Sequence, residues 1–242
     1  MAVDMTETWG DGTVESPKFR RAIDETHDDF RYSAKYYTFD TDEGLVAGAT
    51  ISLTCTIHRP AREVWPVFKD HTLWQDAYHH YYSGVVGDLE GKTFMLSTNP
   101  NEFDKHRYEV LKVIPEHLII VHQPIPDDDF SLAPGHPQGG VSPGVMVSTL
   151  NEFDGETVIN VFMEHRFRTQ VLSEEDALAE FFWMPDALLK WRDVFIPALK
   201  MLVYKGDVPL DWKEKWRESF AEIEGQYAAV LNRSGNSDSG TD

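Results

Sequence analysis

The chain has 242 residues, 41 of them acidic and 22 basic, so its formal net charge is −19. A surface of this sign repels nucleic acid and anionic membranes, and we expect neither as a partner. The single cysteine, Cys55, excludes an intrachain disulfide and any metal site built from cysteines, and it favours a reducing, cytoplasmic compartment. Because no apolar run reaches the roughly 18–20 residues of a membrane-spanning helix, no membrane insertion is expected.

Residues 1–48 are predicted to form an N-terminal extension with one helix. Ser16 is a good helix N-cap, and Pro17 suits the first helical turn. Three apolar residues then fall close to one face of a helix: Phe19, Ile23 and Phe30. A polar linker is expected near residues 38–48.

A strand and a short helix open the central domain, which is expected at residues 49–206. The segment TISLTCTIH (50–58) alternates between apolar and polar residues, as a half-buried strand does. Its apolar face carries Ile51, Leu53, Cys55 and Ile57. A helix should then begin at Pro60, and Pro66 should shorten or kink it.

Five further strands are predicted at residues 93–99, 107–114, 117–123, 145–153 and 157–169. They follow one another directly, which favours sequential antiparallel pairing. Asp154-Gly155 between the last two is a strong hairpin signal. The connection at residues 124–144 contains five prolines and four glycines, and we interpret it either as a lid over a binding site or as a disordered loop.

The C-terminal third is predicted to be helical, with Pro185 splitting it and Pro197 bending it again. An apolar stripe at spacings of three or four residues needs a large surface to cover it: Leu188, Trp191, Phe195, Leu199 and Leu202. A separate amphipathic helix is expected at residues 207–231, followed by a disordered tail at residues 232–242.

Residues 51–74, ISLTCTIHRPAREVWPVFKDHTLW, carry a family resemblance. A strand, a proline-initiated helix with a Val-Trp pair, an aspartate and a tryptophan follow in an order that resembles the opening of the START-like superfamily, also called SRPBCC or Bet v 1-like. The resemblance covers residues 50–204 and implies an α+β helix-grip fold. In that fold a curved antiparallel β-sheet wraps around a long C-terminal helix, and here N- and C-terminal helical extensions would be added.

Members of this superfamily bind lipids, sterols, polyketides or plant hormones in a cavity between the sheet and the helix, and some are cyclases or lyases. The stretch HTLWQDAYHHYYSG (71–84) is a candidate wall of such a cavity. Its aromatic residues either line the cavity or pack the short helices on the sheet: Trp74, Tyr78, Tyr81 and Tyr82. His79 and His80 are neighbours whose side chains point apart, and His79 is the candidate acid or base.

His165 is the other candidate histidine. On TVINVFMEHRF, alternation places it on an apolar face that should be the cavity face: Ile159, Val161, Met163, His165 and Phe167. His165 then donates a hydrogen bond to a ligand carbonyl, acts as a general base, or is a satisfied core histidine. Tyr82 would polarise the ligand oxygen. The remaining predicted ligand-binding residues are His122, Met163, Trp191 and Phe195.

No cofactor or metal is expected. Asp76, Tyr78 and His79 resemble the D-x-Y-H stretch of Rieske oxygenase catalytic domains, which share the superfamily fold. Gly84 stands where the second histidine of that pattern would be, and the cysteines of a Rieske cluster are missing. The two histidines and one carboxylate that would hold mononuclear iron are therefore not assembled.

The sequence leaves three functions open. The first is a START-like protein that binds a small hydrophobic molecule, such as an aromatic compound, polyketide, sterol or lipid, in a central cavity. The second is a polyketide cyclase/dehydratase-like lyase that uses a cavity histidine and a tyrosine as acid and base. The third is a non-catalytic interaction protein that forms a homodimer through the helix carrying Trp212 and Trp216.

Overall fold

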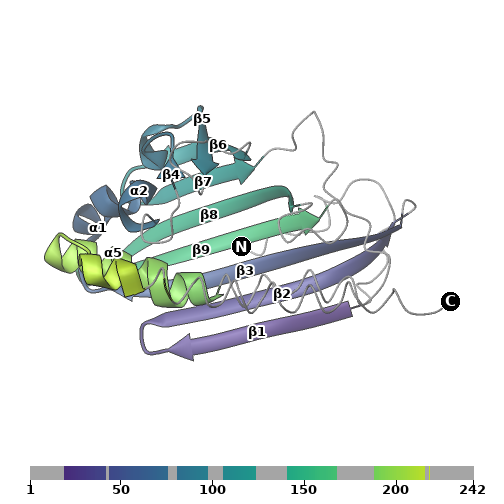
Figure 1. Cartoon of the computed structure of the whole chain (residues 1–242), viewed down its shortest axis with the longest axis horizontal. Helices are drawn as coiled ribbons and strands as arrows, with labels where there is room; N and C mark the ends of the chain where they lie inside the picture. Colours follow the sequence, from purple (N-terminus) through teal and green to yellow (C-terminus); the bar gives the residue numbers. More distant parts are fainter. Residues whose placement is uncertain are drawn as a thin grey trace.

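The computed structural model describes residues 19–41, 44–75, 81–97, 106–123, 141–167, 188–215 and 218. The described strands form one nine-stranded antiparallel sheet in the order β1-β2-β3-β9-β8-β7-β6-β5-β4 (Figure 1). The strands are β1 (Phe19–His27), β2 (Phe30–Thr41), β3 (Gly44–Ile57), β4 (Tyr81–Tyr82), β5 (Thr93–Ser97), β6 (His106–Ile114), β7 (Leu118–Gln123), β8 (Val141–Phe153) and β9 (Glu156–Phe167).

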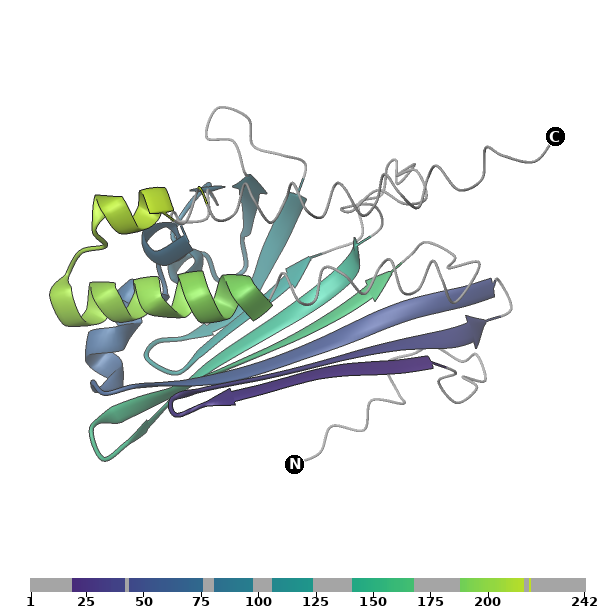
Figure 2. The same ribbon diagram turned by 60° about the horizontal axis from the view of Figure 1, so that its bottom comes forward.

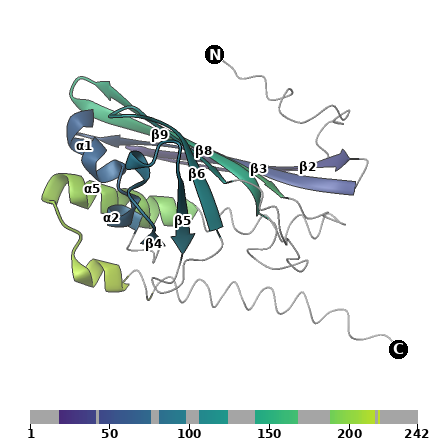
Figure 3. The same cartoon turned by 90° about the horizontal axis from the view of Figure 1, so that it is seen from above.

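Helices cover the concave face of this sheet. They are α1 (Ala61–Phe68), α2 (His71–Gln75), the 3₁₀ turn η3 (Val86–Asp88), the π-helical segment η4 (Lys190–Phe195) and α5 (Ile196–Lys205). Figures 2 and 3 show α5 lying across the sheet on the same side as α1 and α2. This is the α+β helix-grip arrangement that the sequence predicted.

One long-range pairing organises the sheet. The chain leaves β3 through α1 and α2, crosses to the far edge at β4, and returns strand by strand until β9 lies beside β3. The register pairs Ile51 with Met163 and Cys55 with Ile159. Because side chains alternate along a strand, alternate residues of both strands share the concave face, where Ile51, Cys55 and Ile159 are buried.

The prediction of a helix in the N-terminal extension is wrong. Residues 19–41 form the β1–β2 hairpin instead, and β2 extends the sheet beyond β3. The side chains of Phe30, Tyr32 and Ala34 are buried at a spacing of two residues, as in a strand. Pairing with β3 therefore overrides the local helix signals. The domain boundary expected between residues 48 and 49 falls within β3, and the division into domains remains a prediction.

The predicted strands and their hairpin are confirmed. Asp154 and Gly155 have φ angles of 52° and 80°, so both adopt the left-handed conformation that a tight two-residue β-turn requires. Strand β8 begins at Val141, earlier than expected, so the end of the predicted 124–144 loop belongs to the sheet. The rest of that loop, residues 124–140, lies outside the described residues.

At Pro197, where a bend was predicted, a wide π-helical segment passes directly into α5. Proline has no N–H, and its ring crowds the carbonyl four residues earlier. Directly before it, the N–H of Ile196, the first residue of α5, donates to the carbonyl of Trp191 in η4, five residues back. The helix then continues as α5, with Pro197 in its first turn.

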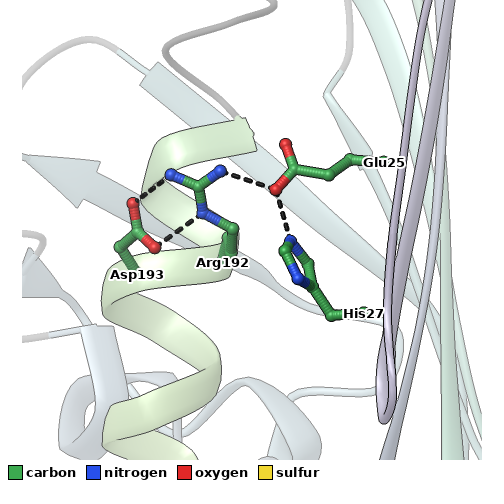
Figure 4. A network of polar contacts seen from close by, with 4 residues as sticks. All are labelled: Glu25, His27, Arg192 and Asp193. Atoms are coloured by element: carbon green, nitrogen blue, oxygen red, sulfur yellow. Dashed lines mark hydrogen bonds and ion pairs between the residues drawn. The ribbon is translucent and has the colours of Figure 1, made fainter.

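A polar network ties this helix to the β1–β2 hairpin (Figure 4). Arg192 Nη1 donates to Glu25 Oε1 at 2.6 Å, and Arg192 Nε and Nη2 donate to the two carboxylate oxygens of Asp193 at 2.7 Å. The ring of His27 lies 2.5 Å from the same Glu25 oxygen. About two turns further along, Lys200 forms an ion pair with Asp29.

These contacts favour the charged form of Glu25. Hydrogen bonds, first from His27 and then from Arg192, lower the pKa of its carboxyl group below the usual 4.5. A carboxylate whose pKa is lower in the folded state stabilises the fold above its unfolded-state pKa. That contribution is lost as the pH falls through the folded-state value.

We expect Glu25→Gln to lower the free energy of unfolding by about 1 kcal/mol at pH 7. The difference from wild type should shrink as the pH falls below about 4.5, because both proteins then carry an uncharged side chain at this position. Urea unfolding at several pH values measures it. When Arg192→Met is already present, Glu25→Gln should lower the free energy of unfolding at pH 7 by less. If the effect of Glu25→Gln depended neither on pH nor on Arg192, the network would be contradicted.

Candidate functional site

The concave face of the sheet is closed at one end and partly open towards the other. Along β9, Ile159 and Val161 are buried, whereas Met163 is only half-buried. On β8, Leu150 is buried and Met146, which pairs with Met163, is half-buried. Met146 and Met163 are therefore partly exposed apolar side chains that pack against the hydrophobic core.

His165 occupies the next position in the same alternating series of β9. Its backbone lies between Ala49 on β3 and Gly144 on β8, both of which are buried. The register therefore agrees with the predicted concave-face position. The side chain of His165 lies outside the described part of the structure, so its role remains a prediction.

A group of aromatic rings joins α1 and α2 to the C-terminal helix. Trp74 stacks on Phe68, with ring centroids 5.7 Å apart, and its centroid lies 5.8 Å from that of Trp191 and 5.9 Å from that of Phe195. A second line of rings crosses the last strands of the sheet, from Tyr82 to Phe94 and Tyr108. We call these rings, with that of His71, the aromatic cluster: Phe68, His71, Trp74, Tyr82, Phe94, Tyr108, Trp191 and Phe195.

The short helix α2 places two rings in this cluster and a buried amide beside it. Asp70 precedes the helix, and its Oδ1 accepts hydrogen bonds from the backbone N–H and the hydroxyl of Thr72 at 3.1 and 2.5 Å. Positions three and four residues apart share one helix face, so His71, Trp74 and Gln75 point inward together and all three are buried. His71 joins the two lines of rings, because its centroid lies 5.0 Å from that of Trp74 and 5.4 Å from that of Tyr82.

The cluster contains few polar atoms, and one of them lacks a partner. The hydroxyl of Tyr82 donates to Gln75 Oε1 at 2.5 Å. The Nε2 atom of His71 is buried and has no hydrogen-bond partner among the described residues. Burial lowers the pKa of His71 to about 3. Burial, with a smaller effect of Tyr108, raises the pKa of Tyr82 well above 10, and burial raises that of Tyr108 to about 12.

These shifts define the chemistry that the cluster offers. At neutral pH the imidazole and both phenols are uncharged. Tyr82 keeps its proton and acts as a hydrogen-bond donor, and a neutral imidazole presents one N–H and one lone pair. With a pKa of about 3, His71 is a weak base at neutral pH. The cluster is therefore suited to holding an uncharged polar group and not, as it stands, to removing a proton.

The structure brings together four of the residues proposed from the sequence: Tyr82, Trp74, Trp191 and Phe195. Tyr81, beside Tyr82 on β4, is half-buried, and Tyr78 and His79 lie outside the described residues. His122 lies elsewhere: its neighbour Val121 is buried, whereas His122 is on the outer face, with its Nδ1 3.7 Å from Glu109 Oε2. We therefore leave His122 out of the proposed site.

Sequence reasoning missed His71, Gln75, Phe94 and Tyr108. The spacing of His71 and Gln75 is a helix-face signal, but five residues are too few for a visible pattern. Phe94 and Tyr108 stand on strands whose pairing is known only from the structure. Their contribution depends on the register of those strands.

A groove of about 590 Å³ lies between the β1–β2 turn and the C-terminal helix. Its apolar floor includes Phe30 and Ile196. The charges along its rim are largely paired with one another, Arg192 with Asp193 and Lys200 with Asp29. Because these charges already have partners of opposite sign, they offer little attraction to a charged ligand. The groove is therefore a weaker candidate for a binding site than the aromatic cluster.

Two kinds of feature are missing from the parts of the chain that the structure describes. No group of three or more histidine, cysteine, aspartate or glutamate side chains there is arranged to hold a metal ion. No helix within the same ranges is long and apolar enough to cross a membrane.

No protein-family model and no curated protein sequence matches this chain. Among solved structures, it is similar to norcoclaurine synthase from Thalictrum flavum at 16% identity and a TM-score of 0.43, over 66% of this chain and 88% of that one. CalU16 from Micromonospora echinospora is 14% identical with a TM-score of 0.37, over 90% and 99% of the two chains. The protein SA2116 from Staphylococcus aureus is 7% identical with a TM-score of 0.49, over 66% and 96%. None of these likenesses assigns a ligand or a reaction to this chain.

The buried His71 should leave a signature in the pH dependence of stability. Its pKa falls from 6.5 to about 3 on folding, so its contribution is fully present above pH 6.5 and is lost as the pH falls towards 3, where the unfolded chain binds the extra proton. Between pH 6 and 4, His71→Phe should reduce the slope of unfolding free energy against pH by up to about 1.4 kcal/mol per unit. Denaturant titrations measure the slope, which a uniform packing change leaves unaltered. Equal slopes would contradict the burial of a neutral His71.

Proposed function

We propose that this protein binds a small hydrophobic molecule between the concave face of the sheet and the C-terminal helix. The observation that carries the proposal is the change in burial along that face. Beyond the fully buried Leu150 and Ile159, the apolar side chains of Met146 and Met163 are only half-buried. Covering such a surface with an apolar ligand gains roughly 25 cal/mol for each Å² removed from water.

The aromatic cluster supports an aromatic or polycyclic ligand. Ligand sites combine large apolar and aromatic surfaces with a few polar groups that fix orientation. Trp191 and Phe195 supply the aromatic surface, and His71, whose Nε2 has no hydrogen-bond partner among the described residues, supplies a polar group. Polyketides, sterols and lipids with ring systems fit this chemistry. We place the protein in the cytoplasm, because its only cysteine, Cys55, is a free thiol.

Several predicted residues complete the proposal from outside the described side chains. His165 would reach the ligand from β9, Tyr78 and His79 from the segment that follows α2, and residues 124–140 would close over it. Tyr81 would contribute from β4.

Tyr82 favours keeping a second function, that of a cyclase/dehydratase-like lyase. Its raised pKa keeps the hydroxyl protonated, and to polarise a ligand carbonyl this proton would have to turn from Gln75 Oε1 to the ligand. His165 or His79 would then remove the proton. An enzyme should convert an added polyphenolic or polyketide substrate, and His165→Ala should abolish conversion without changing the unfolding midpoint. Product analysis by mass spectrometry checks this, and binding without conversion would leave the first function alone.

The third function, a homodimer through the last helix, has less support. Residues 210–215 are helical, and Trp212 is half-buried against the hydrophobic core of its own chain. This packing uses part of the apolar face that a dimer would need. Trp216, the other residue on that face, lies outside the described residues.

Neighbouring residues of β9 provide a matched test of ligand binding. Met163 lies on the concave face, whereas Phe162 points to the other side and is 37% exposed. Met163→Trp should fill the proposed space and weaken binding of the uncharged fluorescent probe N-phenyl-1-naphthylamine by at least about ten-fold. Phe162→Trp should bind it like wild type. Equal affinities in both variants, with unfolding midpoints unchanged, would overturn the proposed position.

A further inference from the structure

We infer that His71 is the polar anchor of the ligand site, and that the ligand carries an uncharged hydroxyl or carbonyl group on its buried edge. This inference rests on the proposed function and names the ligand class for the same site. It makes α2 the element that binds the polar group of the ligand. His71 was not among the site residues predicted from the sequence.

The first observation is an unmet hydrogen bond. The side chain of His71 is nearly inaccessible, with 2% of its surface exposed, and its Nε2 has no partner among the described residues. More than about nine in ten buried polar groups in proteins are hydrogen-bonded, because an unpaired one loses its bonds to water without replacement. A bound ligand group would supply the missing bond.

The second observation is the kind of surface around that atom. The ring of His71 meets Trp74 and Tyr82 edge-on and lies 6.2 Å from the ring of Phe68. The polar partner of Tyr82 is already Gln75, so the Tyr82 hydroxyl proton is engaged. Aromatic faces accommodate planar apolar molecules, so a ring system with one polar edge matches the site.

The third observation concerns charge. His71 remains neutral around pH 7, because burial opposes its protonation. The Nε2 of a neutral imidazole accepts a hydrogen bond from a hydroxyl in one tautomer and donates one to a carbonyl in the other. No described cation stands beside it to balance a carboxylate, and the net charge of −19 opposes an anionic ligand. The anchor therefore selects an uncharged group.

Two probes of similar shape separate this anchor from general hydrophobic binding. 2-Naphthol and 2-methylnaphthalene differ by a hydroxyl in place of a methyl group, and displacement of N-phenyl-1-naphthylamine from the full-length protein gives both dissociation constants. The ratio of the two dissociation constants is measured in wild type and in His71→Phe. Dividing one ratio by the other cancels the difference in hydration between the two probes. We expect the preference for 2-naphthol to be about ten-fold greater in wild type, as one buried hydrogen bond predicts.

Two variants control the measurement. His71→Gln keeps a donor and an acceptor and should retain part of the preference for 2-naphthol. His122→Phe makes the same substitution on the outer face of β7 and should leave the ratio as in wild type. If His71→Phe does not fold, His71→Gln and ¹⁵N NMR of wild type carry the test, because the His71 Nε2 resonance should shift with 2-naphthol and not with 2-methylnaphthalene.

The outcomes separate this inference from the function it rests on. Binding of neither probe to wild type would overturn both. Binding of both probes, with the same ratio in wild type and His71→Phe and no selective shift of the Nε2 resonance, would overturn the anchor and leave hydrophobic binding intact. A lost preference with retained binding of 2-methylnaphthalene is the result expected.

Discussion

The pairing of β9 with β3 is the constraint on which the rest of the structure depends. Residues about 110 positions apart, such as Ile51 and Met163, become neighbours, and the strands between them form one curved surface. Only this closure creates a concave face wide enough to receive a helix. The β1–β2 hairpin can then extend the sheet, because the other edge of β3 is left to pair with β2.

The C-terminal helix is held on that surface by two kinds of contact. Val194, Ala198 and Leu199 are buried and supply apolar packing, while Arg192 and Lys200 reach carboxylates on the hairpin. The apolar contacts set how closely the helix approaches the sheet. The directional ion pairs fix where it lies along the sheet, because each needs a specific partner within hydrogen-bonding distance.

The aromatic cluster combines a large apolar surface with few polar atoms. Its rings provide area, and its polar atoms are neutral because burial disfavours their charged forms. The Tyr82–Gln75 bond is satisfied within the protein, whereas His71 Nε2 is not. In such surroundings a single unmet hydrogen bond weighs more than it would at the surface, because water does not compete for it.

The sequence by itself predicted the strands at residues 50–58 and 157–169 and the Asp154-Gly155 turn, because a two-residue alternation and a left-handed turn are local properties. The helix-grip class followed from the resemblance of residues 51–74 to a known family. The sequence also indicated Trp74, Trp191 and Phe195 as apolar anchors. Only the tertiary structure decided that residues 19–41 are strands, since their pairing partner lies in β3 and their apolar spacing suits a helix equally well. The outward position of His122 and the unpartnered Nε2 of His71 were likewise decided by register and by distant neighbours. Whether a buried atom has a partner depends on what the fold brings beside it, which no local pattern records.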